Sequence, residues 1–303
     1  MSERELIFVG GTGRSGTHII GRLLGEHPRL ADVPIEARLH CNKRGMPDLL
    51  GGRVSLDGYL TKLREFWWHR VRVDDQPRGL YNLMRRAPFD AAAERFEAAY
   101  HSDPVAACRE LFVELLWPFA DEQGKPGLVE MSSHNIREAQ TLRRLFPEAR
   151  FVHTVRDGRD AASSVTTKTW GPDSVVKAID WWAARLRAIE AGVSSTEDGT
   201  EHVLPPDRLH CLVLDDLVHG ERERAYDQLL GFCGLSDDPA IRGFFDGEMG
   251  SRAANRGRWA KGLGPVGRAR VRRKYEGTLE TLERERNHVA APLISAYERD
   301  SAG

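Results

Sequence analysis

The chain has few cysteines, and none of them are closely paired. Only four occur among its 303 residues, namely Cys41, Cys108, Cys211 and Cys233, and no two form a CxxC pair. This spacing argues against a disulfide framework and against a cysteine zinc site. We therefore expect reduced, mostly buried thiols.

Long hydrophobic runs are also missing. No apolar stretch approaches the roughly 20 residues that a membrane-spanning helix needs. The first apolar run, residues 6–9, comes too early and is too short for a secretory signal. We expect a cytoplasmic protein without membrane contact.

Neither sign of charge is in excess. Lys and Arg number 44 against 45 Asp and Glu, which gives a formal net charge of −1. That balance argues against a nucleic-acid partner, because general nucleic-acid binders are strongly basic. Any anion must then be held by locally placed arginines and backbone amides.

Short apolar runs alternate with helical patterns along the chain. Residues 6–9, 127–130, 150–156 and 209–214 are predicted strands, and helical spacing follows three of them, with one helix expected to start near Ala161. This alternation predicts one α/β domain over residues 1–303, with a central parallel sheet and helices on both faces. An aromatic-rich, mainly helical insertion is expected at about residues 40–125, and an exposed loop at 192–206.

A glycine-rich turn, GGTGRSGTH over residues 10–18, joins the first strand to its helix. Backbone N–H groups in such a turn converge on an anion, and the dipole of the following helix favours negative charge. The turn by itself therefore predicts a phosphate or sulfate site. A glycine turn without any ligand is the alternative.

Two nucleotide motifs share this spacing. Gly11-x-Gly13-x-x-Gly16 fits the dinucleotide fingerprint of NAD-dependent enzymes, but Asp32 is the only candidate for the required acid and no clear strand precedes it. Gly11 and Gly16 also have the spacing of an ATP- or GTP-binding loop. There Thr17 stands in place of the phosphate-binding lysine, which argues against a kinase-like enzyme.

The segment GTGRSGT, residues 11–17, resembles the 5′-phosphosulfate loop of the sulfotransferases that use 3′-phosphoadenosine-5′-phosphosulfate (PAPS). The resemblance implies that Arg14 contacts the oxygen between sulfur and phosphorus. The other residues implied to hold this part of the donor are Gly13, Ser15, Gly16, Thr17 and His18.

A second segment, VRDGRDAASS over residues 155–164, resembles the family's 3′-phosphate motif. By that resemblance Arg156 and Ser164 clamp the 3′-phosphate, with Arg156 as a charged planar fork and Ser164 as a neutral donor. Asp157 and Asp160 are expected to cap the helix or to pair with nearby arginines.

A third segment, SRAANRGRW over residues 251–259, is similar to the family's late basic loop, with Arg256 and Gly257 as the candidate donor contacts. The basic run at 268–274 is expected to be a solvated helix face. Relatives often carry Tyr near the end of the third strand, where this chain has Leu214-Asp215-Asp216, so the adenine contact stays open.

Glu36 and Arg38 follow the expected helix end at His27-Pro28. In the tyrosylprotein sulfotransferase branch a similarly placed Glu-x-Arg element supplies the base. The resemblance therefore implies that Glu36 is the general base and that Arg38 orients it or the acceptor. A salt bridge on the surface is the other interpretation.

Histidines are the rival bases, because other branches of the family use histidine. His134 follows EMSS, residues 130–133, in a region where relatives line the active site. His40 is a further candidate, whereas His153 alternates within a strand and is expected to be packed in the core. His18 lies in the glycine turn and is expected to help hold the donor.

Taken together, the resemblance implies a PAPS-dependent sulfotransferase that releases adenosine-3′,5′-bisphosphate. It also implies in-line attack, without a metal, by an acceptor hydroxyl, which we expect on a tyrosyl peptide, sugar, phenol or another small molecule. The alternative class is a kinase-like or NAD-binding enzyme.

Overall fold

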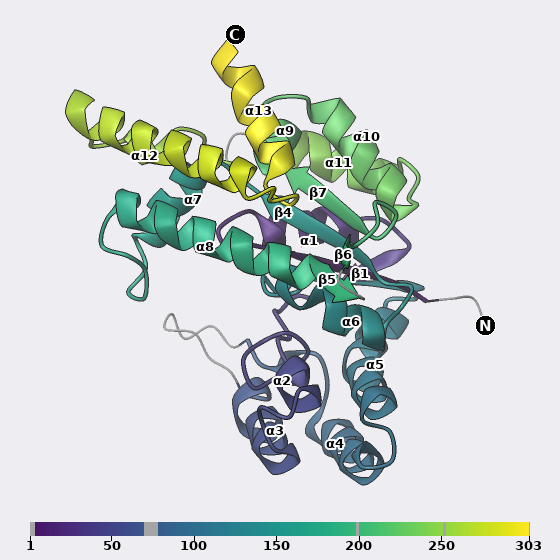
Figure 1. Ribbon diagram of the computed structural model, residues 1–303. Helices are drawn as coiled ribbons and strands as arrows, with labels where there is room; N and C mark the ends of the chain where they lie inside the picture. Colours follow the sequence, from purple (N-terminus) through teal and green to yellow (C-terminus); the bar gives the residue numbers. More distant parts are fainter. Residues whose placement is uncertain (1–3, 70–77, 198–199, 251–252, 303) are drawn as a thin grey trace.

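A five-stranded parallel sheet forms the centre of the computed structural model (Figure 1), which describes the chain except residues 1–3, 70–77, 198–199, 251–252 and 303. The strand order is β2-β3-β1-β4-β7, and every neighbouring pair is parallel. The strands are β1 Glu5–Gly11, β2 Leu30–Asp32, β3 Gly127–Glu130, β4 Arg150–Val155 and β7 Leu209–Val213. The predicted parallel α/β architecture is confirmed.

Alternating side chains of β1 supply the two faces of this sheet. Ile7 and Val9 join a buried cluster with α1 Thr17–Gly25, α9 Leu214–Val218, α10 Arg222–Cys233 and α11 Pro239–Glu248. Leu6 and Phe8 join a second cluster on the other face. Successive side chains of a strand point to opposite faces, so this division gives the three layers that were predicted.

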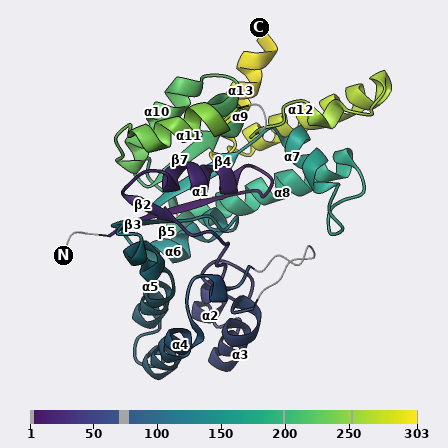
Figure 2. The same ribbon diagram turned by 180° about the vertical axis from the view of Figure 1, so that it is seen from behind.

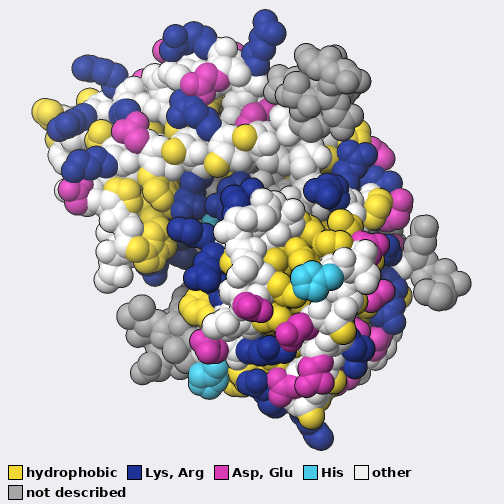
Figure 3. All heavy atoms as spheres, turned by 60° about the horizontal axis from the view of Figure 1, so that its bottom comes forward, with side chains coloured by type: hydrophobic (Ala, Val, Ile, Leu, Met, Phe, Trp, Pro, Cys, Tyr) yellow, Lys and Arg dark blue, Asp and Glu magenta, His cyan; other side chains and the backbone are white. Residues whose placement is uncertain are grey.

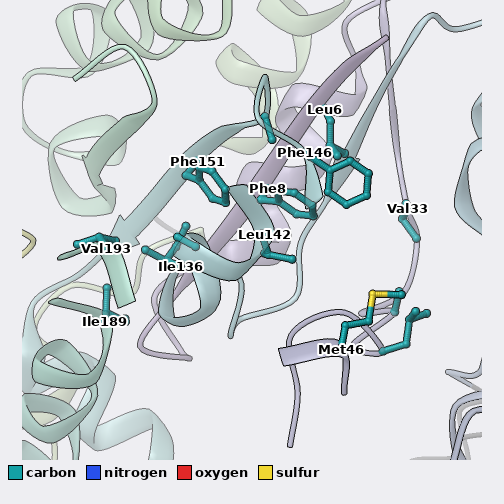
Figure 4. Close-up of a cluster of buried hydrophobic side chains, with 14 of the residues drawn as sticks. Leu6, Phe8, Val33, Met46, Ile136, Leu142, Phe146, Phe151, Ile189 and Val193 are labelled. Carbon is teal, nitrogen blue, oxygen red and sulfur yellow. The ribbon is translucent and has the colours of Figure 1, made fainter. Parts of the chain in front are cut away.

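The second face is covered by a longer series of helices (Figures 1 and 2). Figure 4 shows Phe8 and Phe151 of neighbouring strands beside Phe146 and Leu142. The centroids of the Phe8 and Phe151 rings lie 5.5 Å apart. The helices of this layer are α6 Ala139–Leu145, α7 Gly158–Val165, α8 Val175–Val193, α12 Pro265–Arg284 and α13 Ala291–Ala302, with single turns η3 Ile136–Glu138 and η4 Arg258–Ala260.

The described residues between β2 and β3 are mainly helical, as expected, and form a lobe at the bottom of Figures 1 and 2. Its long α5 packs against β2, β3 and α6, and so joins the lobe to the sheet. The elements are α2 Met46–Leu50, α3 Leu56–Lys62, the π-helical turn η1 Leu63–Trp67, the turn η2 Leu80–Asn82, α4 Arg86–Tyr100 and α5 Pro104–Glu122.

Three local expectations were wrong. Part of the expected loop at 192–206 forms two antiparallel strands, β5 Ser194–Glu197 and β6 Thr200–Val203. A composition rich in Ser, Thr and Glu is typical of loops, but β-branched Thr and Val also favour strands. The helix expected near Ala161 already begins at Gly158, because the Asp157 side chain caps it by accepting the Arg159 N–H at 2.8 Å.

The third correction concerns Asp32, which does end a strand. That strand, β2, lies at the sheet edge, and β3 separates it from β1. In the dinucleotide fold the acidic residue ends the strand directly beside β1. The NAD-binding interpretation therefore loses Asp32, the residue proposed as its acid.

All four cysteines are free, and Cys41, Cys108 and Cys233 are buried, as expected. The arginines of the run at 268–274 are exposed on α12, as predicted. Within the described ranges, no helix combines the length and the apolar character needed to cross a bilayer.

Candidate active site

The glycine turn is held tightly between the ends of β1, β3 and β4. A Cβ atom on Gly11 would lie 2.3 Å from the Thr154 carbonyl oxygen, so only glycine fits there. The Gly11 N–H donates to the Ser133 carbonyl at 3.0 Å. Gly16 has φ 96° and is the N-cap residue of α1. Glycine has no side chain, so no side chain at the N-cap accepts the first N–H groups of this helix. These groups are available to an anion at the helix N-terminus.

Arg14 connects the two motifs that the sequence places about 150 residues apart. Its Nε donates to the Ser164 Oγ at 2.9 Å. The next residue, Ser15, is fully buried, and its hydroxyl lies 3.1 Å from that of Thr154 at the end of β4. The glycine turn and the first helical turns after β4 therefore form one site.

Arg156 lies in this site directly after β4, and it is buried. One terminal nitrogen donates to the Asn255 carbonyl at 2.9 Å. Its Nε is also buried and has no hydrogen-bond partner among the described residues. Buried N–H groups are nearly always paired in folded proteins, so this donor indicates a missing acceptor.

The late basic loop packs onto α7 through Asp160. This buried carboxylate accepts the Gly257 N–H at 2.8 Å and the Trp259 N–H at 3.0 Å. The expectation that Asp160 caps its helix or pairs with an arginine was wrong, whereas Asp157 does both, with the Arg159 N–H and guanidinium. The exposed Arg256 side chain is ion-paired with Asp300, and residues 251–252 lie outside the described part.

Glu36 is a buried carboxylate between two basic groups. The Arg38 guanidinium is ion-paired with it, and the His18 Nε2 lies 3.6 Å from its Oε1. Burial acts to raise the pKa of Glu36, but His18 and Arg38 outweigh it and hold that pKa well below the usual range. Since Glu36 is only 6% exposed, the salt bridge is not on the surface.

A second buried carboxylate, Glu130, fixes the loop that carries Glu36. It accepts the Ala37 N–H at 3.1 Å, the Ser132 hydroxyl at 2.7 Å and the Asn135 amide at 2.7 Å. His40 Nε2 lies 3.0 Å from it and is fully buried, so His40 cannot reach an acceptor. Sequence reasoning missed Glu130, although its place at the carboxyl end of β3 was a signal.

His134 lies among three arginines. Burial and then the charges of Arg137, Arg185 and Arg38 lower the pKa of His134 to about 3. His153 is buried in β4, as expected, and burial lowers its pKa to about 4. Figure 3 shows Lys and Arg side chains gathered in a hollow of one face, with hydrophobic side chains along one wall.

The fold is α/β, and the site lies at a glycine turn whose following helix has no side-chain cap at its N-terminus. The chain belongs to the sulfotransferase family, whose model matches residues 6–239. It is therefore a transferase that moves a sulfuryl group to an acceptor, and the kinase-like alternative falls away. The comparison with curated protein sequences gave no match.

Several solved structures are similar to the chain, and three of them are as follows. The sulfotransferase domain of a Synechococcus olefin synthase is 17% identical with a TM-score of 0.49, over 90% of this chain and 93% of that one. A sulfotransferase from Alicyclobacillus acidocaldarius is 15% identical with a TM-score of 0.45, over 92% and 94%. Sulfotransferase STF1 from Mycobacterium tuberculosis is 15% identical with a TM-score of 0.44, over 80% and 71%.

Proposed function

We propose that the chain transfers the sulfuryl group of PAPS to a hydroxyl acceptor, with Glu36 as general base. One observation carries the proposal, namely the hydrogen bond from Arg14 to Ser164. It joins the segment that resembles a 5′-phosphosulfate loop to the segment that resembles a 3′-phosphate motif. PAPS carries both groups, whereas ATP and NAD lack the pair.

The residues present fit such a donor. The N–H groups at the start of α1 and the unpaired Arg156 Nε can both receive anionic oxygens. The Gly257 N–H already donates to Asp160, so we propose that Gly257 acts through the conformation of the loop. The Arg256 side chain would leave its ion pair with Asp300 to bind the donor. The proposed donor-binding residues are Gly13, Arg14, Ser15, Gly16, Thr17, His18, Arg156, Ser164, Arg256 and Gly257.

The chemistry needs a base on the acceptor side and positive charge on the leaving-group side. Arg14 supplies the charge, since a guanidinium stabilises the negative charge that develops on the departing phosphate. Glu36 takes the acceptor proton, and Arg38 orients it. Its low pKa makes Glu36 a weak base, but an anion bound at the glycine turn adds negative charge near His18 and Arg38. That charge moves the pKa of Glu36 upward, toward a useful value.

Calorimetry with adenosine-3′,5′-bisphosphate and 5′-AMP tests the donor. The wild type is expected to bind the bisphosphate much more tightly, because the 3′-phosphate requires a charged partner once it is desolvated. Arg156→Ala should remove most of this preference, a loss of about 2–5 kcal/mol, and Ser164→Ala about 1 kcal/mol. The affinity for 5′-AMP should stay nearly unchanged in both variants.

The exposed Arg270 on α12 offers a matched control, and Arg270→Ala should leave both affinities unchanged. Equal affinities of the wild type for the two nucleotides would remove PAPS as the donor. Stabilisation against heating by ATP with magnesium or by NAD, but not by the bisphosphate, would have the same meaning. The absence of a metal requirement and the cytoplasmic location stay predictions.

A further inference from the structure

Two of the arginines around His134, Arg137 and Arg185, lie on elements that pack closely together. Arg137 lies in the turn η3 and Arg185 in α8, and these two elements pack together. A Cβ atom on Gly192 of α8 would lie 2.0 Å from the Arg137 carbonyl oxygen, so any larger residue would push the elements apart. The two positively charged side chains therefore project from a rigid frame.

Arg185 is the arginine of this group that lacks an acidic partner. Arg38 is paired with Glu36, and Arg137 with Glu138 at 2.9 Å. Across the described residues Arg185 has no hydrogen bond or ion pair, and its buried Nε is unpaired. Burial and the charge of Arg137 lower its pKa. An unpaired, partly buried guanidinium is costly, and an anion between the arginines would remove that cost.

Trp181 links this arginine to the donor turn. The Arg185 guanidinium lies 4.5 Å from the centroid of the Trp181 ring. The edge of the same ring is 3.9 Å from where a Cβ atom on Gly13 would stand. Trp170, 62% exposed, lies 6.2 Å from Trp181 between ring centroids. Positive charge and a flat apolar surface thus adjoin the place where transfer would occur.

We propose that Arg185, together with Arg137, binds a carboxylate of the acceptor, and that the acceptor is an aromatic hydroxy acid whose ring packs on Trp170 and Trp181. The inference rests on the proposed function and specifies its substrate class. In the step itself, the acceptor oxygen forms a bond to sulfur while the bond from sulfur to the phosphate oxygen breaks. The hydroxyl proton passes to Glu36, and adenosine-3′,5′-bisphosphate leaves.

Three phenols with a negative, a neutral and a positive side chain test the carboxylate site, namely 4-hydroxyphenylacetate, its methyl ester and tyramine. With PAPS as donor, the wild type should show a kcat/KM about 10- to 100-fold higher for the acid than for the ester, the range expected for charge-assisted hydrogen bonds. Tyramine should have the lowest kcat/KM of the three, because its positive charge would face the two arginines. Arg185→Gln should reduce the kcat/KM for the acid to that for the ester, and Arg137→Gln should lower the kcat/KM for the acid as well.

Arg187→Gln is the matched control, because Arg187 lies on the same helix α8 but is more exposed and is paired with Glu285 at 2.7 Å. It should leave the preference for the acid intact. Bisphosphate affinity should stay within about twofold in every variant, since the proposed site serves the acceptor and not the donor. A large loss of bisphosphate binding in Arg185→Gln would assign the cluster to the donor and overturn the proposal.

Binding without turnover separates this proposal from the proposed function. Ligand-observed NMR measures the binding of each of the three probes to the protein, with and without the bisphosphate. Preferential binding of 4-hydroxyphenylacetate that Arg185→Gln abolishes supports the site, even if no sulfate is transferred. Equal binding of the acid and the ester, or no binding of the acid, overturns it. Failure of the bisphosphate to bind would instead count against the proposed function.

Discussion

Two arginines at the site, Arg14 and Arg38, have backbone conformations that are rare for residues with a side chain. Their φ angles are 61° and 63°. Such residues persist where the surrounding structure fixes them, and they cluster at active sites. Ser164 holds Arg14, and the Ser132 hydroxyl accepts the Arg38 N–H at 3.2 Å. The backbone thus directs both guanidinium groups.

Glu36 and His134 compete for the role of base, and single substitutions separate them. Glu36→Gln keeps the shape of the side chain but cannot accept the proton, so the single-turnover rate from PAPS should fall by about 10²–10⁴. His134→Gln should change the rate only a few-fold. Bisphosphate affinity, measured alongside, should survive in both variants. A collapse in His134→Gln with little change in Glu36→Gln would make His134 the base.

Loops from three places in the chain meet at the carboxyl ends of the strands. The glycine turn follows β1, the segment 156–164 follows β4, and the late loop comes from beyond α11. Register brings the first two together, because Gly11 pairs with Thr154. Asp160 brings in the third through the N–H groups of Gly257 and Trp259. Asp160 therefore helps to position the late loop, together with Arg156, which donates to the Asn255 carbonyl.

Asp160→Asn tests this contribution of Asp160. The amide replaces one acceptor oxygen with an N–H donor, so one loop N–H group loses its partner. We expect bisphosphate affinity to fall by about tenfold and the free energy of unfolding by about 1–3 kcal/mol. Amide hydrogen exchange at Gly257 and Trp259 should speed up, whereas the exposed Asp227→Asn should change neither quantity. Unchanged exchange in Asp160→Asn would mean that other contacts hold the loop.

The four strands with clear apolar runs were predictable from the sequence. Burial on both faces requires near-continuous hydrophobic residues there, as in β1 and β4. The edge strand Leu30–Asp32 was not predictable, because three residues are too few to show a pattern of alternating apolar and polar side chains. The strand pair β5 and β6 after α8 was missed because its composition is that of a loop.

The same contrast applies to the site. The arginines and serines of the glycine turn and of the segment 156–164 follow strands closely, so the local sequence pattern locates them. The network around Glu130 joins residues from separate segments, including Ala37, Ser132 and Asn135. Only the folded chain brings such partners together, and no spacing in the sequence encodes them. The same is true of Arg185 beside Arg137.

At the scale of the whole molecule, His40 lies where the sheet, the site and the helical lobe meet. Its ring stacks on Phe8 of β1 at 5.6 Å and meets Phe112 of α5 edge-on at 5.1 Å. Its Nε2 contacts Glu130 and Asn135, at 3.0 and 2.8 Å. A histidine–glutamate pair without solvent contact therefore lies at the junction. We expect the free energy of unfolding to depend on the protonation of this pair.

The direction of each pKa shift sets the pH window. Burial acts to lower the pKa of His40, but Cys41 and Glu130 outweigh it and raise that pKa well above the usual 6.5. Burial acts to raise the pKa of Glu130, but His40 outweighs it and lowers that pKa below the usual 4.5. The contribution of His40 to the free energy of unfolding is complete below pH 6.5 and is lost as pH rises through the pKa of His40 in the folded protein. The glutamate contribution is present above pH 4.5 and is lost as pH falls.

Glu130→Gln should therefore destabilise the protein most between these two values, by about 3–5 kcal/mol, because it leaves a buried group without its charged partner. The difference in free energy of unfolding between wild type and variant should shrink as pH rises above 6.5, by at most about 1.4 kcal/mol per pH unit. It should also shrink below 4.5. Urea unfolding followed by tryptophan fluorescence at a series of pH values measures it. The exposed Glu298→Gln should give a small difference at every pH, and a large but pH-independent difference for Glu130→Gln would show that the pair is not charged in the folded protein.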